Sequence, residues 1–162
     1  MTDRLQAWGD TKIVNIASCI VSNESGQILL LQRHSDDLGG DRWGFPGGRT
    51  EPDEDAKDTA LRELAEETGI QGQTADSLGI HRVQMPHGAV ELRSYRVVVP
   101  NDVSIVLNPK EHLAYRWYDV PSIAQQPHIL WGVPTILHDF GFLHELHNDP
   151  TLTDSSTVIR LA

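Results

Sequence analysis

The sequence predicts one α/β domain built around a mixed β-sheet. Three observations support this fold class. Apolar segments typical of strands outnumber helical segments, one helix with clear ends lies among them, and strands and helices do not alternate regularly. The length of 162 residues is typical of a single domain and is sufficient for a buried core.

The first half of the chain contains a predicted hairpin and a glycine-rich turn. Residues 12–21 and 27–33 are apolar and strand-like, and the sequence SNESG between them supplies turn residues. A polar loop over residues 35–42 follows. The sequence WGFPGG comes next and predicts a short strand that enters a tight turn.

A helix is predicted from Asp55, as N-cap, to Gly69, which suits the position just after a helix end. Asp58 lies three residues after Asp55, as in a capping box. Two faces are expected, one with Leu61, Leu64, Ala65 and Thr68, and the opposite one with Glu63, Glu66 and Glu67. Three carboxylates so close together repel one another, unless they hold a hard cation such as Mg²⁺.

The second half predicts further strands at residues 78–85, 90–99 and 113–118. A short helix is expected over residues 119–125, and a terminal helix over residues 133–146 with Pro134 at its start. We therefore expect residues 1–148 to form the single domain, and residues 149–162 to form a C-terminal tail or an exchanged arm.

Charge and composition exclude several classes of protein. The net charge of −10 argues against general nucleic-acid binding, since phosphates repel an acidic surface. No segment approaches the roughly 20 apolar residues of a membrane span, and the first ten residues lack a signal-peptide core, so a cytoplasmic protein is expected. Cys19 is the single cysteine, which prevents an intrachain disulfide, and its apolar neighbours predict a core residue.

The helix belongs to a longer pattern that begins at Gly48. Glu54 follows after five residues, Arg62 and Glu63 after seven more, and the pattern ends at Ile70, giving G-x5-E-x7-R-E-U-x-E-E-x-G-U with U an apolar residue. It resembles the Nudix box with every defined position filled. The resemblance implies a Nudix-type α/β/α sandwich with a mixed sheet, and a divalent-metal-dependent hydrolase of nucleoside diphosphate derivatives.

The resemblance also implies roles for individual residues. The expected metal ligands are Glu63, Glu66, Glu67 and the backbone carbonyl of Gly48, with Mg²⁺ as the cofactor and Mn²⁺ as its substitute. Arg62 is expected to orient a glutamate of the box, and Glu54 to be its partner or an outer ligand.

A further acidic residue is expected from a later loop. Glu111 and Trp117 have the spacing of the E-x5-W segment that recurs in the family, so Glu111 is expected as a metal ligand or catalytic residue. Glu91 and Asp102 are weaker candidates.

Specificity lies outside the box, where the sequence is less informative. Arg33 and Arg49 are candidate phosphate ligands. Five aromatic residues are candidates for stacking on a base, with core packing as the alternative for each: Trp43, Phe45, Tyr95, Trp117 and Trp131.

The expected substrate is a nucleoside triphosphate, with ADP-ribose or a nucleotide sugar as the alternative. Pro86 matches a position associated with ADP-ribose pyrophosphatases, whereas the WGFPGG approach resembles nucleoside triphosphate pyrophosphatases. An alternative of another class is a non-catalytic nucleotide-binding sensor. The expected partner is therefore a small phosphorylated nucleotide, without nucleic acid or membrane, and the chain is expected to be a monomer or a homodimer.

Overall fold

The computed structural model describes residues 13–37, 39–85 and 88–161, and Pro86 lies outside them. Within these residues one eight-stranded sheet has the strand order β3-β2-β1-β6-β5-β8, while β4 pairs with β1 and β7 pairs with β2. The strands are β1 (Ile13–Ser22), β2 (Ile28–Arg33), β3 (Trp43–Gly44), β4 (Gly47–Arg49), β5 (Asp76–Met85), β6 (Gly88–Val98), β7 (His112–Tyr118) and β8 (Thr157–Leu161).

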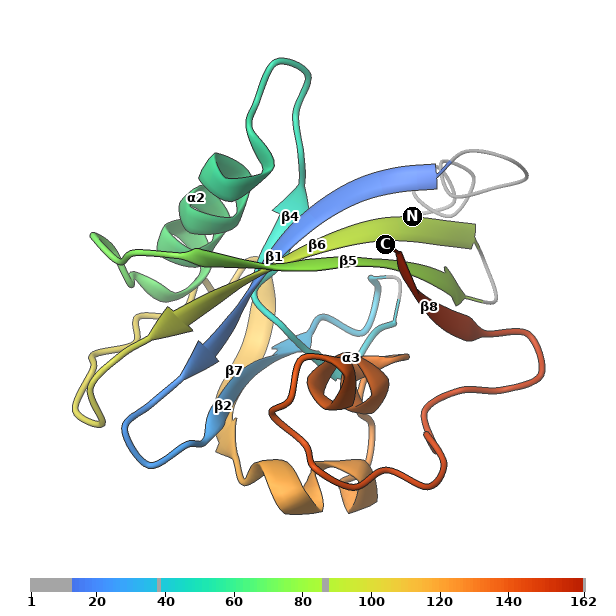
Figure 1. Ribbon diagram of the computed structural model, residues 1–162. Helices are drawn as coiled ribbons and strands as arrows, with labels where there is room; N and C mark the ends of the chain where they lie inside the picture. The colour runs from blue at the N-terminus through green and yellow to red at the C-terminus, as the bar shows by residue number, and fades with distance from the viewer. Residues whose placement is uncertain (1–12, 38, 86–87, 162) are drawn as a thin grey trace.

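The helices cover both faces of this sheet (Figure 1). They are α2 (Ala56–Thr68), the 3-10 helix η1 (Val120–Gln125) and α3 (Val133–Asp139). One apolar cluster, which includes Leu64 of α2, lies on one face, and a second cluster, which includes Ile136 and Leu137 of α3, lies on the other. The pairing of β1 with β6 is parallel and that of β1 with β4 is antiparallel. The predicted α/β/α sandwich with a mixed sheet is therefore confirmed.

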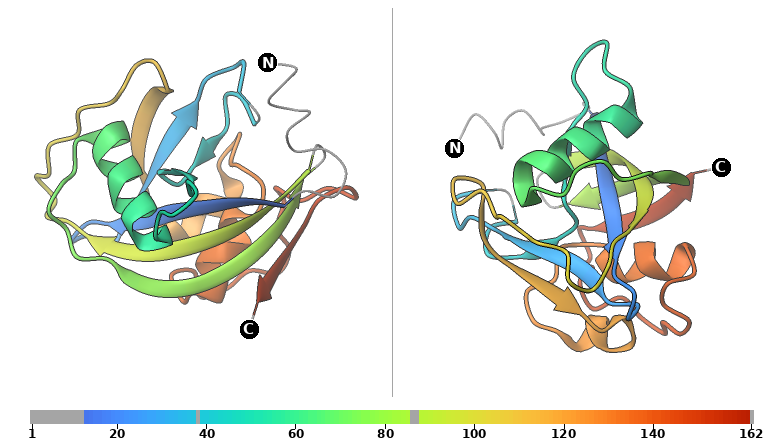
Figure 2. Two further views of the ribbon diagram at one scale, coloured as in Figure 1. Left: turned by 90° about the horizontal axis from the view of Figure 1, so that it is seen from above. Right: turned by 90° about the vertical axis from the view of Figure 1, so that its left-hand side faces the viewer.

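The strands β1 and β2 meet only near their hairpin, where Ser22 pairs with Ile28. Beyond that point β4 takes the place of β2 beside β1, with Ala17 opposite Gly48. The strand β2 instead continues between β3 and β7 (Figure 2). The two halves of the sheet diverge, and residues of both halves line one cavity.

Helix α2 begins and ends where the sequence predicts, but its buried face differs. Asp55 has the extended backbone of an N-cap without a capping side-chain hydrogen bond, and Gly69 ends the helix with a left-handed φ of 77°. Leu61 and Ala65, expected on the apolar face, are only partly buried. The buried residues of the helix are Thr59, Ala60, Leu64, Glu67 and Thr68.

Helix α3 is shorter than predicted, so the expectation of a helix through residue 146 was wrong. Gly141 adopts a left-handed φ of 83°. Its N–H donates to the carbonyl of His138, and the N–H of Phe142 donates to the carbonyl of Leu137. These two hydrogen bonds form a Schellman motif, which satisfies the last carbonyls and turns the chain away.

The C-terminal segment returns to the sheet. Strand β8 pairs antiparallel with β5, with Val158 opposite Val83. Asp149 anchors the preceding loop, because its carboxylate accepts hydrogen bonds from the backbone and side chain of both Thr135 and Thr151. The division of the chain at residue 148 stays a prediction.

Candidate functional site

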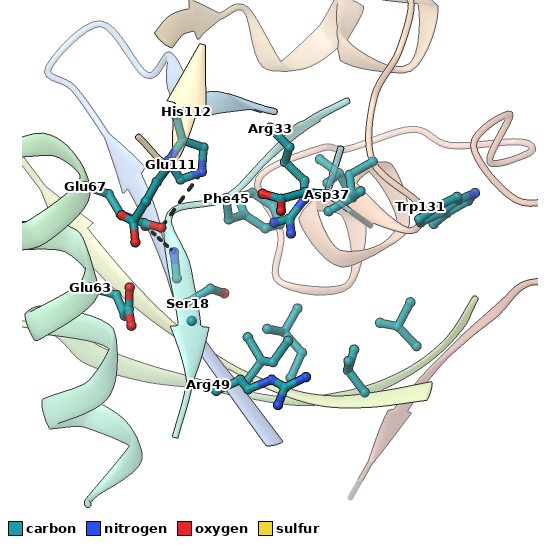
Figure 3. A pocket seen from close by; sticks show the side chains of 18 of the residues that line it. Ser18, Arg33, Asp37, Phe45, Arg49, Glu63, Glu67, Glu111, His112 and Trp131 are labelled. Atoms are coloured by element: carbon teal, nitrogen blue, oxygen red, sulfur yellow. Dashed lines mark hydrogen bonds and ion pairs between the residues drawn. The ribbon is translucent and has the colours of Figure 1, made fainter. Parts of the chain in front are cut away.

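A cavity of ≈ 820 Å³ opens where the two halves of the sheet diverge (Figure 3). Its lining has a charged end next to α2 and an apolar end next to α3. The lining residues are Ile16, Ser18, Arg33, Asp37, Phe45, Gly47, Gly48, Arg49, Glu63, Glu67, Val83, Met85, Val90, Leu92, Lys110, Glu111, His112, Leu130, Trp131, Val133 and Ile136.

The charged end gathers carboxylates from two distant segments. Helix α2 contributes Glu63 and Glu67, and the loop before β7 contributes Glu111. The exposed fraction of the side chain falls from 49% for Glu66 to 14% for Glu63 and 6% for Glu67. The three glutamates of the box therefore do not share one solvated face, and Glu67 is the most enclosed of them.

The turn before α2 explains why Glu67 points inward. The backbone N–H of Gly47 donates a 2.8 Å hydrogen bond to Oε1 of Glu67, which ties the far end of the helix to β4. A Cβ at Gly47 would lie 2.6 Å from the carbonyl oxygen of Ala17 on β1. A Cβ at Gly48 would lie 2.4 Å from Cδ of Glu63. Both glycines thus permit a close approach, one to the sheet and one to a carboxylate.

Backbone hydrogen bonds hold the Glu111 loop against the end of α2. The N–H groups of Val106 and Asn108 donate to the carbonyls of Thr68 and Glu67, at 2.8 and 3.3 Å. The N–H groups of Glu111 and His112 in turn donate to the carbonyl of Asn108. These contacts bring Glu111 and His112 close to Glu67, although both residues lie more than forty positions after Glu67 in the chain.

Arg62 connects the glutamates of the box outside the cavity lining. Its Nε and Nη2 donate to the two carboxylate oxygens of Glu54, at 2.8 and 3.1 Å. Its Nη1 donates to Glu63 at 3.1 Å and to Glu66 at 3.3 Å. The fork of hydrogen bonds fixes the side chain, as a bidentate pair does. Arg62 therefore contacts three glutamates of the box, and its orienting role stays a prediction.

Electrostatics at the charged end disfavour bare carboxylates. Burial raises the pKa of Glu67 well above its usual range, the charge of Glu63 raises it further, and the Gly47 N–H opposes the shift. Burial also raises the pKa of Glu63, against the opposing charge of Arg62. In contrast, the hydrogen bond from Arg62 lowers the pKa of Glu54 to about 2. A cation in the cavity would relieve the repulsion between the two buried glutamates.

His112 was not singled out in the sequence, and it completes the charged end. Its Nε2 lies 3.8 Å from Oε2 of Glu67, and the ligand atoms of Glu67, Glu111 and His112 all lie within 4.8 Å of one another. Burial and the charge of Arg33 lower the pKa of His112 to about 4, so the imidazole is neutral at pH 7 and the contact with Glu67 is no ion pair. The position beside Glu111 was the one available signal.

Of the remaining residues that the sequence suggested for substrate binding or catalysis, some line the cavity and others do not. Arg33 and Arg49 line the cavity, as do the aromatic residues Phe45 and Trp131. The Trp131 ring is held by Arg42, whose guanidinium carbon lies 4.6 Å from the ring centroid. Five other candidates are not among the lining residues: Glu91, Asp102, Trp43, Tyr95 and Trp117.

Glu91 pairs instead with Arg82 and Arg93, at 3.3 Å each. Cys19 is fully buried, its Sγ contacts the carbonyl of Ala60, and burial raises its pKa to about 12, as expected of a core residue. None of the described helices is long and apolar enough to cross a membrane.

Together, a mixed sheet between helices and a carboxylate-lined cavity at the end of the glycine turn define the class of Nudix folds. The family model of the NUDIX domain matches residues 12–140 of the 162-residue chain. The chain therefore belongs to the NUDIX domain family. It is a hydrolase of this family, an enzyme that acts on the phosphoric anhydride linkage of nucleotides.

Individual relatives agree with this assignment. The chain is 29% identical over 116 residues to the CTP pyrophosphohydrolase of Escherichia coli K12, covering 72% of this chain and 83% of that protein. It is 42% identical over 66 residues to a putative 8-oxo-dGTP diphosphatase of Bacillus subtilis, covering 41% of this chain. The chain spans 42% of the length of the Bacillus protein, and 38% of a mouse relative, the nucleoside diphosphate-linked moiety X motif 6.

Solved structures show the same fold. A MutT protein from Methanosarcina mazei Go1 superposes with a TM-score of 0.72 at 24% identity, covering 82% of this chain and 96% of that one. The E. coli ORF135 protein superposes with a TM-score of 0.63 at 27% identity, covering 80% of this chain and 89% of that one.

Proposed function

We propose that the chain hydrolyses the pyrophosphate linkage of a nucleoside triphosphate with the help of a divalent cation. One observation supports this above all: a single cavity joins a carboxylate cluster to an apolar, aromatic end. A nucleotide has the same two ends, since its phosphates bind a divalent cation and its base presents flat apolar faces. The relatives named for CTP and for 8-oxo-dGTP share the triphosphate and differ in the base.

The proposed cation ligands are the carboxylates of Glu63, Glu67 and Glu111 and the backbone carbonyl of Gly48, with Glu66 as an outer ligand at the exposed rim. Mg²⁺ is the proposed cation, because it prefers oxygen ligands, and Mn²⁺ is the proposed substitute. The donor set fits such an ion, and the close approach of Gly48 to Glu63 leaves no room for a side chain there. When bound, the cation offsets the charge of the phosphates and acidifies water.

The residues around this cluster position it and bind substrate. Arg62 holds Glu63 and Glu66 in place through its hydrogen bonds to both, while Glu54 fixes its guanidinium from the other side. Arg33 is proposed to bind a phosphate group near the carboxylates, since its charge already acts on Glu67. Arg49 lines the same cavity and is proposed as a second phosphate ligand. Glu111 is proposed to accept the proton of the attacking water, because it is the least enclosed of the three lining glutamates.

The apolar end is proposed to hold the base. Phe45 and Trp131 supply aromatic surface there, together with aliphatic side chains of β5, β6 and α3. Apolar packing discriminates between substrates only by roughly 10–200-fold. We therefore expect several nucleoside triphosphates to be cleaved at rates within about 100-fold of one another.

The setting of the enzyme is also a proposal. We propose a cytoplasmic location, because thiols stay reduced there and the single cysteine of this chain is a buried free thiol. Its acidic net charge supports a small nucleotide rather than nucleic acid as its partner. A monomer or a homodimer is proposed for its assembly.

The experiment is hydrolysis of a substrate panel in Mg²⁺ and then in Mn²⁺. The panel contains canonical and oxidised nucleoside triphosphates, ADP-ribose, nucleotide sugars and dinucleoside polyphosphates, with the products resolved by anion-exchange chromatography. Triphosphates should be cleaved fastest. Glu67→Gln should lose most of this activity, whereas Glu91→Gln, which alters an ion-paired glutamate outside the cavity, should retain it.

Two outcomes would overturn the proposal, and a third would change only the role of Glu67. Faster cleavage of ADP-ribose or of a nucleotide sugar would transfer the assignment to that substrate class. Tight nucleotide binding with no cleavage in either cation would favour a nucleotide sensor. Near-normal turnover by Glu67→Gln would remove that residue from the catalytic site.

A further inference from the structure

His112 lines the cavity beside the glutamates. It is the first residue of β7, and its side chain is 8% exposed. Its Nδ1 is buried without a partner, and its Nε2 points to Oε2 of Glu67 (Figure 3). The other oxygen of Glu67 is already bound by the N–H of Gly47, so Oε2 is the oxygen that Glu67 offers to the cavity.

The distance between the two side chains suits a shared ion better than a direct hydrogen bond. A separation of 3.8 Å exceeds the range of an N–H···O hydrogen bond. Two ligands at about 2.1 Å from one cation are 3.8 Å apart when they subtend roughly 130° at the cation. The ligand atom of Glu111 lies within 4.8 Å of both, so small side-chain rotations bring all three to one ion.

The surrounding backbone holds this trio in place without a ligand. The hydrogen bonds from Val106 and Asn108 to the end of α2 fix the loop that precedes β7. The carbonyl of Asn108 accepts from the N–H groups of both Glu111 and His112. The backbone segments that carry the three side chains are therefore tied to one another by hydrogen bonds before any ion binds.

We propose that Glu67, Glu111 and His112 form a mixed nitrogen and oxygen cation site, in which Nε2 of His112 is a direct ligand. Imidazole favours transition metals, whereas Mg²⁺ favours an all-oxygen set. The site should therefore bind Mn²⁺, Co²⁺ or Zn²⁺ more tightly than Mg²⁺. This inference rests on the proposed function, because Glu67 and Glu111 belong to the catalytic cavity.

The competing explanation is a purely structural histidine. A shift of less than about 1 Å would allow Nε2–H of His112 to donate to Glu67 directly. His112 would then orient the carboxylate and take no part in metal binding. The two explanations differ in whether nitrogen contacts the ion, which magnetic resonance detects without reference to turnover.

The test uses the full-length protein loaded with Mn²⁺ and studied by pulsed electron paramagnetic resonance. We expect ¹⁴N modulation from a bound imidazole, and its replacement by ¹⁵N frequencies after labelling with [¹⁵N]histidine. His112→Asn should lose the modulation, and its Mn²⁺ affinity by titration calorimetry should fall by about 10-fold or more. Its Mg²⁺ affinity should change much less. His144→Asn, an exposed histidine, is the matched control and should behave as the unaltered chain.

The outcomes separate this inference from the proposed function. Mn²⁺ binding that needs Glu67 but shows no nitrogen modulation in the unaltered chain overturns the role of His112 and leaves the hydrolase proposal standing. An equal loss of Mg²⁺ and Mn²⁺ affinity in His112→Asn also contradicts nitrogen ligation as the source of metal preference. No binding of either cation, together with no hydrolysis, would overturn the proposed function itself.

Discussion

Replacement of the two glycines before α2 by alanine should separate catalysis from folding. A Cβ at Gly48 would lie 2.4 Å from Cδ and 2.5 Å from Oε1 of Glu63, both at the end of a flexible side chain. A Cβ at Gly47 would instead lie 2.6 Å from the carbonyl oxygen of Ala17 and 2.8 Å from Cα of Ser18, both of which are backbone atoms of β1. The same added methyl group therefore meets a movable partner at one position and a fixed partner at the next.

The expected magnitudes follow from these contacts. Ordinary van der Waals contact begins near 3.4 Å, so in Gly48→Ala the carboxylate of Glu63 must retreat by about 1 Å. A misplacement of about 1 Å at a catalytic centre can lower the rate by roughly 100-fold, or about 2.7 kcal/mol of transition-state stabilisation. Because only a side chain moves, the free energy of unfolding should change by less than about 1 kcal/mol. In Gly47→Ala the overpacked backbone should cost about 1–3 kcal/mol of that free energy.

The assay compares kcat/KM on the best nucleoside triphosphate with the melting temperature of each variant. Gly48→Ala should lose most activity and melt close to the unaltered chain. Gly47→Ala should melt lower by roughly 2–10 °C, given the usual entropy of unfolding for a domain of this size. If Gly48→Ala keeps activity within about threefold, Glu63 does not need the position that the structure gives it. If both variants are destabilised equally, the distinction between movable and fixed partners is wrong.

Three further predictions concern other parts of the molecule. Burial lowers the pKa of His81 from its usual 6.5, so the unfolded chain binds more protons below about pH 6.5 and stability should fall as the pH drops. Urea unfolding across pH 5–7.5 should show this fall, and His81→Gln should make it shallower; the remaining fall comes from His112, whose pKa is also lowered. Arg62→Lys should lower kcat by about 10–100-fold at nearly constant melting temperature, since lysine cannot make the bidentate pair with Glu54, and a normal kcat would contradict the orienting role. Asp149→Ala leaves four donors without their acceptor and should cost about 2–4 kcal/mol in denaturant unfolding; a loss below about 0.5 kcal/mol would show that water replaces the carboxylate.

Local patterns in the sequence were sufficient for most of the elements. The strand segments, the hairpin and the limits of α2 all follow from apolar periodicity and from turn residues such as Gly69, which act over a few positions. The sequence also carried a local signal for the end of α3, because Gly141 terminates this helix. The apolar spacing of Phe140 and Leu143 nevertheless predicted a longer helix. Leu143 still reaches the core, by way of the turn rather than the helix.

The long-range pairings were beyond such patterns. That β8 lies beside β5 depends on contacts between residues about 75 positions apart, which no local periodicity encodes. The inward orientation of Glu67 depends likewise on the N–H of Gly47, twenty positions earlier. Both arise because a buried polar or unpaired backbone group needs a partner, and the partner is supplied by a distant segment.

The sequence by itself determined the family, the acidic helix and the glycine turn, because the spacing of these residues is a local property that a single stretch carries in full. Only the tertiary structure decided which glutamates face the cavity, since Glu67 is enclosed and lines it, whereas Glu66 is exposed and does not. It alone brought His112 to the carboxylates, through a loop anchored on the end of α2. Burial and charge depend on everything that packs around a residue, and that environment exists only after the chain has folded.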